Sequence, residues 1–111
     1  MRSSKTKSIP FLLFSTASTL PEAKKIAQLL VKQKLAACVN IVPGLTSYFK
    51  WQGKLDQAKE YLLVVKTEER QLKKIESAIR KIHSYSVPEI IGVPITWGAK
   101  PYLDWLSKSI S

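Results

Sequence analysis

The sequence predicts an α+β fold in which a four-stranded antiparallel sheet carries two helices on one face. Four segments are rich in apolar, β-branched or aromatic residues, and apolar residues recur at helical spacing in the segments between them. Two of the strand-like segments are joined by a tight turn. The length of 111 residues suits one domain. We expect that domain to span residues 9–111, preceded by a disordered basic tail at residues 1–8.

The first strand and helix are predicted from residue 9 onward. Residues 9–16 carry apolar side chains at both odd and even positions, which predicts a strand with two apolar faces. Thr19 and Glu22 then have the spacing of a capping box, and Pro21 suits the first turn of a helix. The helical spacing continues to about Lys34.

The longest predicted feature is a hairpin over residues 36–67. Its first strand begins at Ala36 or Ala37, and Pro43-Gly44 should interrupt it as a bulge or bend. The turn is predicted at Gln52-Gly53, and the second strand is best defined from Lys59 to Thr67. These strands far exceed the usual length of ~5–6 residues. A hairpin of this length is expected to project beyond the rest of one small domain.

The remaining elements complete a recognisable order. A second amphipathic helix is expected to follow Glu68-Glu69 and to end near His83, and a fourth strand is expected at residues 90–96. Pro101 suits the start of a C-terminal helix. The order is β-α-β-β-α-β plus a helix, which is the ferredoxin-like pattern.

The faces of the strands predict an oligomer. Two helices cover only one face of a sheet, yet residues 9–16 and 59–67 are apolar on both faces. An exposed apolar face favours aggregation, so we expect other copies of the chain to cover it in a closed assembly.

Composition limits the function classes. No segment has the ~20 apolar residues of a membrane span. Cys38 is the only cysteine, which excludes an internal disulfide and is typical of the reducing cytoplasm. No catalytic motif is legible, so we do not expect an enzyme. The net charge of +10 attracts polyanions in general, but the same charge is equally explained as a surface that keeps the protein soluble.

Three groups of residues have both a functional and a structural interpretation. Cys38 is either a thiolate ligand for a soft metal or a small buried hydrophobe. His83 either forms a polar site with Tyr85 and Glu89 or closes the second helix by hydrogen bonding. The aromatic residues near the turn, which include Trp51, either stack on nucleic-acid bases or pack in a subunit interface.

Five segments together resemble the CutA divalent-cation-tolerance family. They are residues 35–44, 47–54, 60–67, 83–90 and 102–106, and the similarity covers about residues 9–107. The resemblance implies a homotrimer of ferredoxin-like subunits, similar to PII signalling proteins. It also implies a role in tolerance of divalent cations, copper above all.

The resemblance also implies the candidate site residues. A weakly bound copper(II) or other divalent cation would be held by His83, Glu89 and Cys38, with no tightly bound cofactor. The family's usual His-Pro-Tyr block reads His83-Ser84-Tyr85 here, and Ser15 and Ile82 stand where some members have ligands. A cleft between subunits is expected to be lined by Lys66, Tyr85, Trp51, Tyr102 and Trp105. Two alternatives remain: a small anionic ligand in that cleft, with Lys66 as its counter-charge, or nucleic-acid binding driven by net charge.

Overall fold

A computed structural model describes residues 8–111. The predicted tail at residues 1–8 therefore lies outside the described residues, apart from Ser8, whose hydroxyl accepts a hydrogen bond from the Arg70 N–H. The elements in chain order are β2 (Pro10–Ala17), α1 (Leu20–Lys32), β3 (Cys38–Trp51), β4 (Lys54–Glu68), a 3-10 turn (Glu69–Gln71), α2 (Leu72–Ile82), β5 (Ile91–Pro94) and α3 (Lys100–Ser109).

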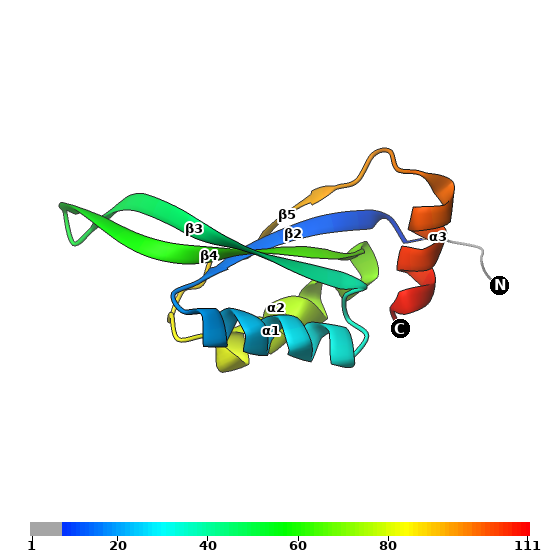
Figure 1. The fold of residues 1–111 in the computed structure, drawn as a ribbon, viewed down its shortest axis with the longest axis horizontal. Helices are drawn as coiled ribbons and strands as arrows, with labels where there is room; N and C mark the ends of the chain where they lie inside the picture. Colours follow the sequence, from blue (N-terminus) through cyan, green and yellow to red (C-terminus); the bar gives the residue numbers. More distant parts are fainter. Residues whose placement is uncertain (1–7) are drawn as a thin grey trace.

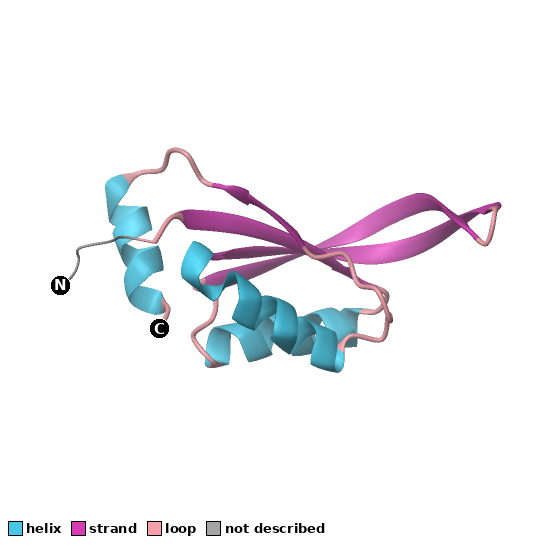
Figure 2. Cartoon of the chain, turned by 180° about the vertical axis from the view of Figure 1, so that it is seen from behind, coloured by secondary structure: helices cyan, strands magenta, loops and turns pink. Residues whose placement is uncertain are grey.

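The four strands form one sheet in the order β3-β4-β2-β5, and every neighbouring pair is antiparallel. Helices α1 and α2 lie together on one face of it, and α3 lies at one end (Figures 1 and 2). This arrangement confirms the predicted ferredoxin-like fold. The core lies between the two helices and the sheet, and its fully buried side chains include Ile26, Leu30, Leu63, Ile75 and Ile79.

The β3–β4 hairpin projects well beyond the rest of the sheet (Figure 1). Because β2 pairs with β4 only as far as Tyr61, residues 45–60 of the hairpin have only each other as strand partners among the described residues. The turn is at Gln52-Gly53, as predicted, with φ values of 52° and 79° that suit a two-residue hairpin turn. Strand β4 begins at Lys54, earlier than the predicted Lys59, because the backbone ladder continues through polar side chains that show no apolar alternation.

The predicted interruption at Pro43-Gly44 is a β-bulge. Val42 pairs with Leu62 and Leu45 pairs with Glu60, so two residues of β3 oppose one of β4. Gly44 takes a φ of +84°, a backbone conformation that a residue with a Cβ rarely adopts. The bulge marks the point where the hairpin leaves the sheet.

Other boundaries differ slightly from the prediction. Strand β2 is Pro10–Ala17 rather than residues 9–16, and β3 begins at Cys38 rather than at Ala36 or Ala37. Helix α1 ends at Lys32 rather than Lys34, because Lys34 takes a left-handed φ of 57° that ends the helical path. The fourth strand is Ile91–Pro94 rather than residues 90–96, and it pairs only with residues 11–14 of β2.

The sheet has one face without a helix, which we call the open sheet face. Strand register places on it the residues that alternate with the core positions: Leu12, Phe14, Thr16, Cys38, Asn40, Val42, Leu62, Val64, Lys66, Ile91 and Val93. Most of them are apolar. Ile91 is 59% exposed and Val93 is 48% exposed in the single chain. The predicted second apolar face is therefore present, and no helix of residues 8–111 covers it.

Candidate functional site

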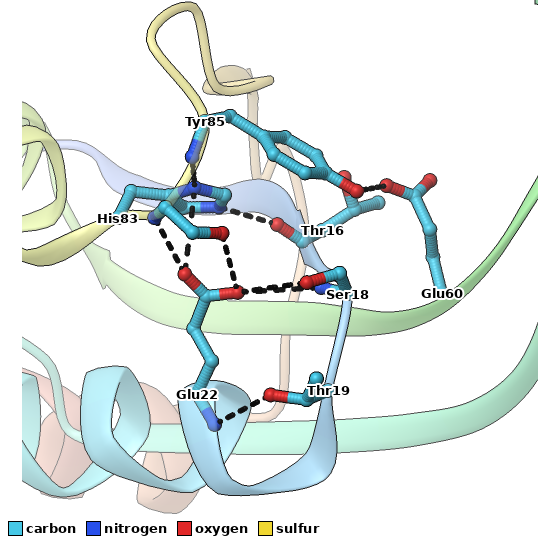
Figure 3. A network of polar contacts seen from close by, with 8 residues as sticks. Thr16, Ser18, Thr19, Glu22, Glu60, His83 and Tyr85 are labelled. Carbon is cyan, nitrogen blue, oxygen red and sulfur yellow. Dashed lines mark hydrogen bonds and ion pairs between the residues drawn. The ribbon is translucent and has the colours of Figure 1, made fainter.

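A cluster of polar residues lies where β2 ends, α1 begins and α2 ends (Figure 3). We call it the His83 cluster. Its members are Thr16, Ser18, Glu22, Ser47, Glu60, His83, Ser84 and Tyr85.

His83 closes helix α2, and both of its ring nitrogens are engaged. Strand β5 pairs with β2 only as far as Phe14, and His83 lies against the part of β2 that β5 leaves uncovered. Its Nε2 lies 2.7 Å from the Thr16 carbonyl oxygen, and its Nδ1 lies 3.0 Å from the Tyr85 backbone nitrogen. A carbonyl only accepts and an N–H only donates, so this network requires a neutral imidazole with its proton on Nε2. The side chain is 0% exposed.

Glu22 connects the start of α1 to the end of α2. The Thr19 hydroxyl accepts the Glu22 N–H at 3.2 Å, which confirms the Thr19 half of the predicted capping box. The Glu22 carboxylate reaches back to the Ser18 N–H at 3.3 Å rather than to the Thr19 N–H of the standard box. The same carboxylate accepts the Ser84 N–H at 2.6 Å and the Ser84 hydroxyl at 3.1 Å. It also lies 3.7 Å from His83 Nδ1. One side chain thus caps a helix and anchors a loop 62 residues away.

These contacts keep Glu22 ionised. Burial alone would raise the pKa of its carboxyl group, but the hydrogen bonds from Ser84 and Ser18 outweigh burial and lower that pKa. A proline at position 84 would supply no N–H for the shortest of these bonds.

Tyr85 links the His83 cluster to the β3–β4 hairpin. Its hydroxyl donates to Glu60 at 2.8 Å, and the Ser47 hydroxyl donates to the other carboxylate oxygen of Glu60 at 2.7 Å. Glu60 is only 8% exposed, so these two donors stabilise a buried carboxylate. Burial first, and then the hydrogen bond and negative charge of Glu60, raise the pKa of Tyr85 to about 12. The Tyr85 ring also contacts His83, with 4.9 Å between ring centroids.

The three residues predicted to hold a metal do not meet within one chain. Cys38 begins β3 opposite Lys66, whereas the Thr16 carbonyl that His83 contacts belongs to a residue paired with Leu62. Four residues along a strand separate these positions, which is ~13 Å. Glu89 is exposed on the loop before β5 and does not enter the His83 cluster. Within residues 8–111, no group of three or more His, Cys, Asp and Glu side chains could hold a metal ion.

The residues predicted to line a cleft between subunits are also spread over the chain. Trp51 is at the tip of the hairpin, whereas Tyr102 and Trp105 lie on α3 at the opposite end of the molecule (Figure 1). Tyr102 and Trp105 contact each other, with ring centroids 5.5 Å apart, and both are partly exposed. Lys66 lies on the open sheet face. The chain is 52 Å long, so only several copies could gather these residues around one cleft.

Sequence reasoning missed most members of the His83 cluster. The sequence assigns Glu22 only a local capping role, and it predicts no function for Ser18, Ser47, Glu60 or the Thr16 carbonyl. The one usable signal was Glu60, an acidic residue beside the apolar run of β4. A carboxylate in that position needs partners when it is buried.

The chain is similar to proteins of one family along nearly its whole length. The sequence model described as "CutA1 divalent ion tolerance protein" matches residues 11–109. The "Divalent-cation tolerance protein CutA" of Thermus thermophilus is 48% identical over 87 residues, which cover 78% of this chain and 84% of that protein. "Protein CutA, chloroplastic" of Arabidopsis thaliana is 41% identical over 105 residues, which cover 94% of this chain and 58% of that longer protein.

A solved structure agrees with the sequence comparison. The divalent cation tolerance protein Cut A1 of Thermus thermophilus superimposes with a TM-score of 0.91 and 42% identity, covering 93% of this chain and all of that one. The sequence match over residues 11–109 includes the hairpin, the helices and the residues of the His83 cluster. The chain therefore belongs to the CutA1 family of divalent ion tolerance proteins.

Proposed function

We propose that this chain acts in divalent-cation tolerance as a PII-like homotrimer. The observation that carries the proposal is the family match over residues 11–109, together with a fold that leaves one sheet face uncovered. The family supports the function, and the exposed apolar surface supports association with other copies.

The open sheet face supports the trimer on physical grounds. Ile91 and Val93 are exposed beside half-buried Phe14 and Val64 on the same face. Burial of apolar surface stabilises by ~25 cal/mol per Å², so covering this face with other copies is favourable. In a closed symmetric assembly, the open sheet face of every copy would be covered, so none would remain exposed. The projecting hairpin would then contact a neighbouring subunit.

Assembly would also bring the predicted cleft residues together. In a trimer, Trp51 at one end of one subunit can approach Tyr102 and Trp105 at the other end of its neighbour. Lys66 would face the same region from the sheet. We propose that this intersubunit cleft, rather than a pocket within one chain, is the functional site.

Any metal site would be weak and would use more than one subunit. His83 can bind a cation only if its ring gives up the Tyr85 N–H or the Thr16 carbonyl. A first-row metal such as copper(II) prefers several nitrogen, oxygen or sulfur ligands, which Cys38 and Glu89 of other copies would have to supply. We therefore propose weak uptake of copper(II) or another divalent cation.

The metal proposal is tested by calorimetric titration of copper(II) into the wild type and into His83→Ala, Glu89→Gln and Cys38→Ser. Loss of the weak binding in His83→Ala is the expected result. Lys50→Gln, on the hairpin, is a control that should bind like the wild type. Equal copper uptake by the wild type and all three site variants would reject this ligand set.

A small anionic ligand in the cleft is the second candidate function, and Lys66 favours it. Lys66 is half-buried on the open sheet face beside Cys38 and Leu12, and within residues 8–111 it forms no ion pair. A half-buried cation without a counter-charge is a suitable partner for a carboxylate or phosphate. A thermal-shift screen of anionic metabolites should find a ligand that stabilises the wild type but not Lys66→Met. A flat screen would count against this function.

We further propose a binding role rather than catalysis, in the cytoplasm. The buried, doubly hydrogen-bonded His83 ring supports the first point, because a general base needs a nitrogen that faces substrate. The single cysteine supports the second. Among the described helices, none is long and apolar enough to cross a membrane.

Nucleic-acid binding driven by net charge would show an affinity that falls steeply with salt.

A further inference from the structure

The outer side of the helical layer carries a groove that the proposed function does not use. Helices α1 and α2 lie side by side (Figure 2), and two adjoining hollows of about 510 and about 350 Å³ follow them. Leu29 and Ile82 line both hollows, so the two form one continuous feature. We call it the helix groove.

Lysines surround this groove without any acidic residue. Lys24, Lys25 and Lys32 line the larger hollow, and Lys74 and Lys81 line the smaller one. Neither hollow is lined by Asp or Glu, and none of the five lysines forms an ion pair within residues 8–111. Five unpaired like charges around one groove create a positive potential that favours an anionic partner.

The floor of the groove is apolar. Leu29 and Ile82 are half-buried between the lysines. The groove therefore offers an apolar contact at its centre and cations at its rim. Lys24 and Lys32 are eight residues apart on one helix, which is ~12 Å, so the cationic rim matches about two turns of a helical peptide.

We propose that the helix groove docks an acidic peptide segment of another protein, with one apolar side chain of that segment over Leu29 and Ile82. An amphipathic segment that lays its apolar side into such a groove is a common mode of peptide recognition. The partner's Asp and Glu side chains would pair with the five lysines.

The shape and composition of the groove favour a peptide over other polyanions. Nucleic-acid strands bind through aromatic side chains on which bases stack, and none lines the groove. A membrane surface requires apolar side chains that protrude from the helices, whereas Leu29 and Ile82 lie half-buried at the floor. An acidic peptide presents single apolar side chains between charged ones, so one apolar side chain can enter the hollow.

The groove stays accessible in the proposed trimer. Its helices cover one face of the sheet, and the open sheet face is the other. Copies packed against the open sheet face would leave the helical layer in solvent. The docking proposal and the trimer can therefore each fail without the other.

The test begins with selection from a random library of peptides of about 12 residues displayed on phage, with the full-length wild-type protein as bait. The counter-selection bait is the groove variant Lys25→Glu/Lys81→Glu. A matched control, Lys54→Glu/Lys108→Glu, changes the net charge by the same amount at the hairpin and on α3. Circular dichroism melting would establish that both double variants are folded.

The expected result is enrichment of peptides in which Asp or Glu flank Leu, Ile or Phe. Fluorescence anisotropy with a selected peptide should then show an affinity about tenfold weaker in the groove variant, given the size of two reversed ion pairs. The control variant should change it by less than about threefold, because screened charges at that distance contribute little. Replacement of the peptide's apolar residue by Ser should also weaken binding.

Three outcomes would overturn the proposal. One is the absence of acidic enrichment. Another is an equal loss of affinity in the groove and control variants, which would mean that net charge alone drives binding. The third is groove-dependent binding of a single-stranded oligonucleotide, or of phosphatidylserine vesicles, that is tighter than the binding of every selected peptide.

Discussion

The His83 cluster and the open sheet face differ in how many of their side chains find a partner within one chain. In the cluster, both ring nitrogens of His83 and both carboxylate oxygens of Glu60 have partners. On the open sheet face, Ile91 and Val93 are exposed and Lys66 forms no ion pair among residues 8–111. The residues with reactive chemistry are thus committed to the fold, whereas the apolar surface is left for a partner. We infer that assembly of subunits creates the functional site.

The largest effect is expected from a charge on the open sheet face. Val93→Asp should dissociate the proposed trimer, because it places a carboxylate in a surface that copies would bury. Val31→Asp, on the exposed side of α1, is the matched control: Val31 is 43% exposed and Val93 is 48% exposed in the single chain. Light scattering should give a smaller mass for Val93→Asp only. The same mass for both variants would show that the open sheet face is not the interface.

The next largest effect concerns His83. His83→Ala leaves the Thr16 carbonyl and the Tyr85 N–H without a protein partner, so we expect the free energy of unfolding to fall by about 2–4 kcal/mol. His83→Gln, which keeps a donor and an acceptor, should recover part of this loss. Denaturant titration measures both variants. A His83→Ala protein as stable as the wild type would show that the His83 hydrogen bonds do not stabilise the fold.

Tyr85→Phe tests the link to the hairpin. It leaves Glu60 with only the Ser47 hydroxyl, which should cost about 1–2 kcal/mol of unfolding free energy. Tyr48→Phe removes the same hydroxyl from an exposed position on the hairpin and should cost less than about 0.5 kcal/mol. Denaturant titration of the two variants makes the comparison. Equal costs would mean that the Tyr85–Glu60 contact adds no stability.

The smallest effect is the acid dependence of Glu22. Because its pKa is lower in the folded protein than in the unfolded chain, its contribution is present above the unfolded pKa and is lost as pH falls through the folded pKa. Glu22→Gln should therefore make stability less dependent on pH in the acid range. Glu76→Gln, an exposed residue of α2, serves as the control. Unfolding curves collected from neutral pH to about pH 3 measure the difference, and parallel curves for Glu22→Gln and the wild type would contradict the assignment.

Local patterns predicted the fold well, and long-range contacts explain what they missed. The helix cap at Thr19, the bulge at Pro43-Gly44 and the turn at Gln52-Gly53 each depend on neighbouring residues, and each is present. The contacts of Glu22 with Ser84 and of Tyr85 with Glu60 span 62 and 25 residues, and no periodicity encodes them. The proposed metal and cleft residues depend on contacts between copies, which the pattern of one chain does not specify.

The mass of the wild-type protein in solution tests the central claim most directly. Size-exclusion chromatography with light scattering at micromolar concentration should give three times the 12.5 kDa of one chain. A mass of 12.5 kDa under the same conditions would contradict the account, because the open sheet face would then be stable in water without a partner.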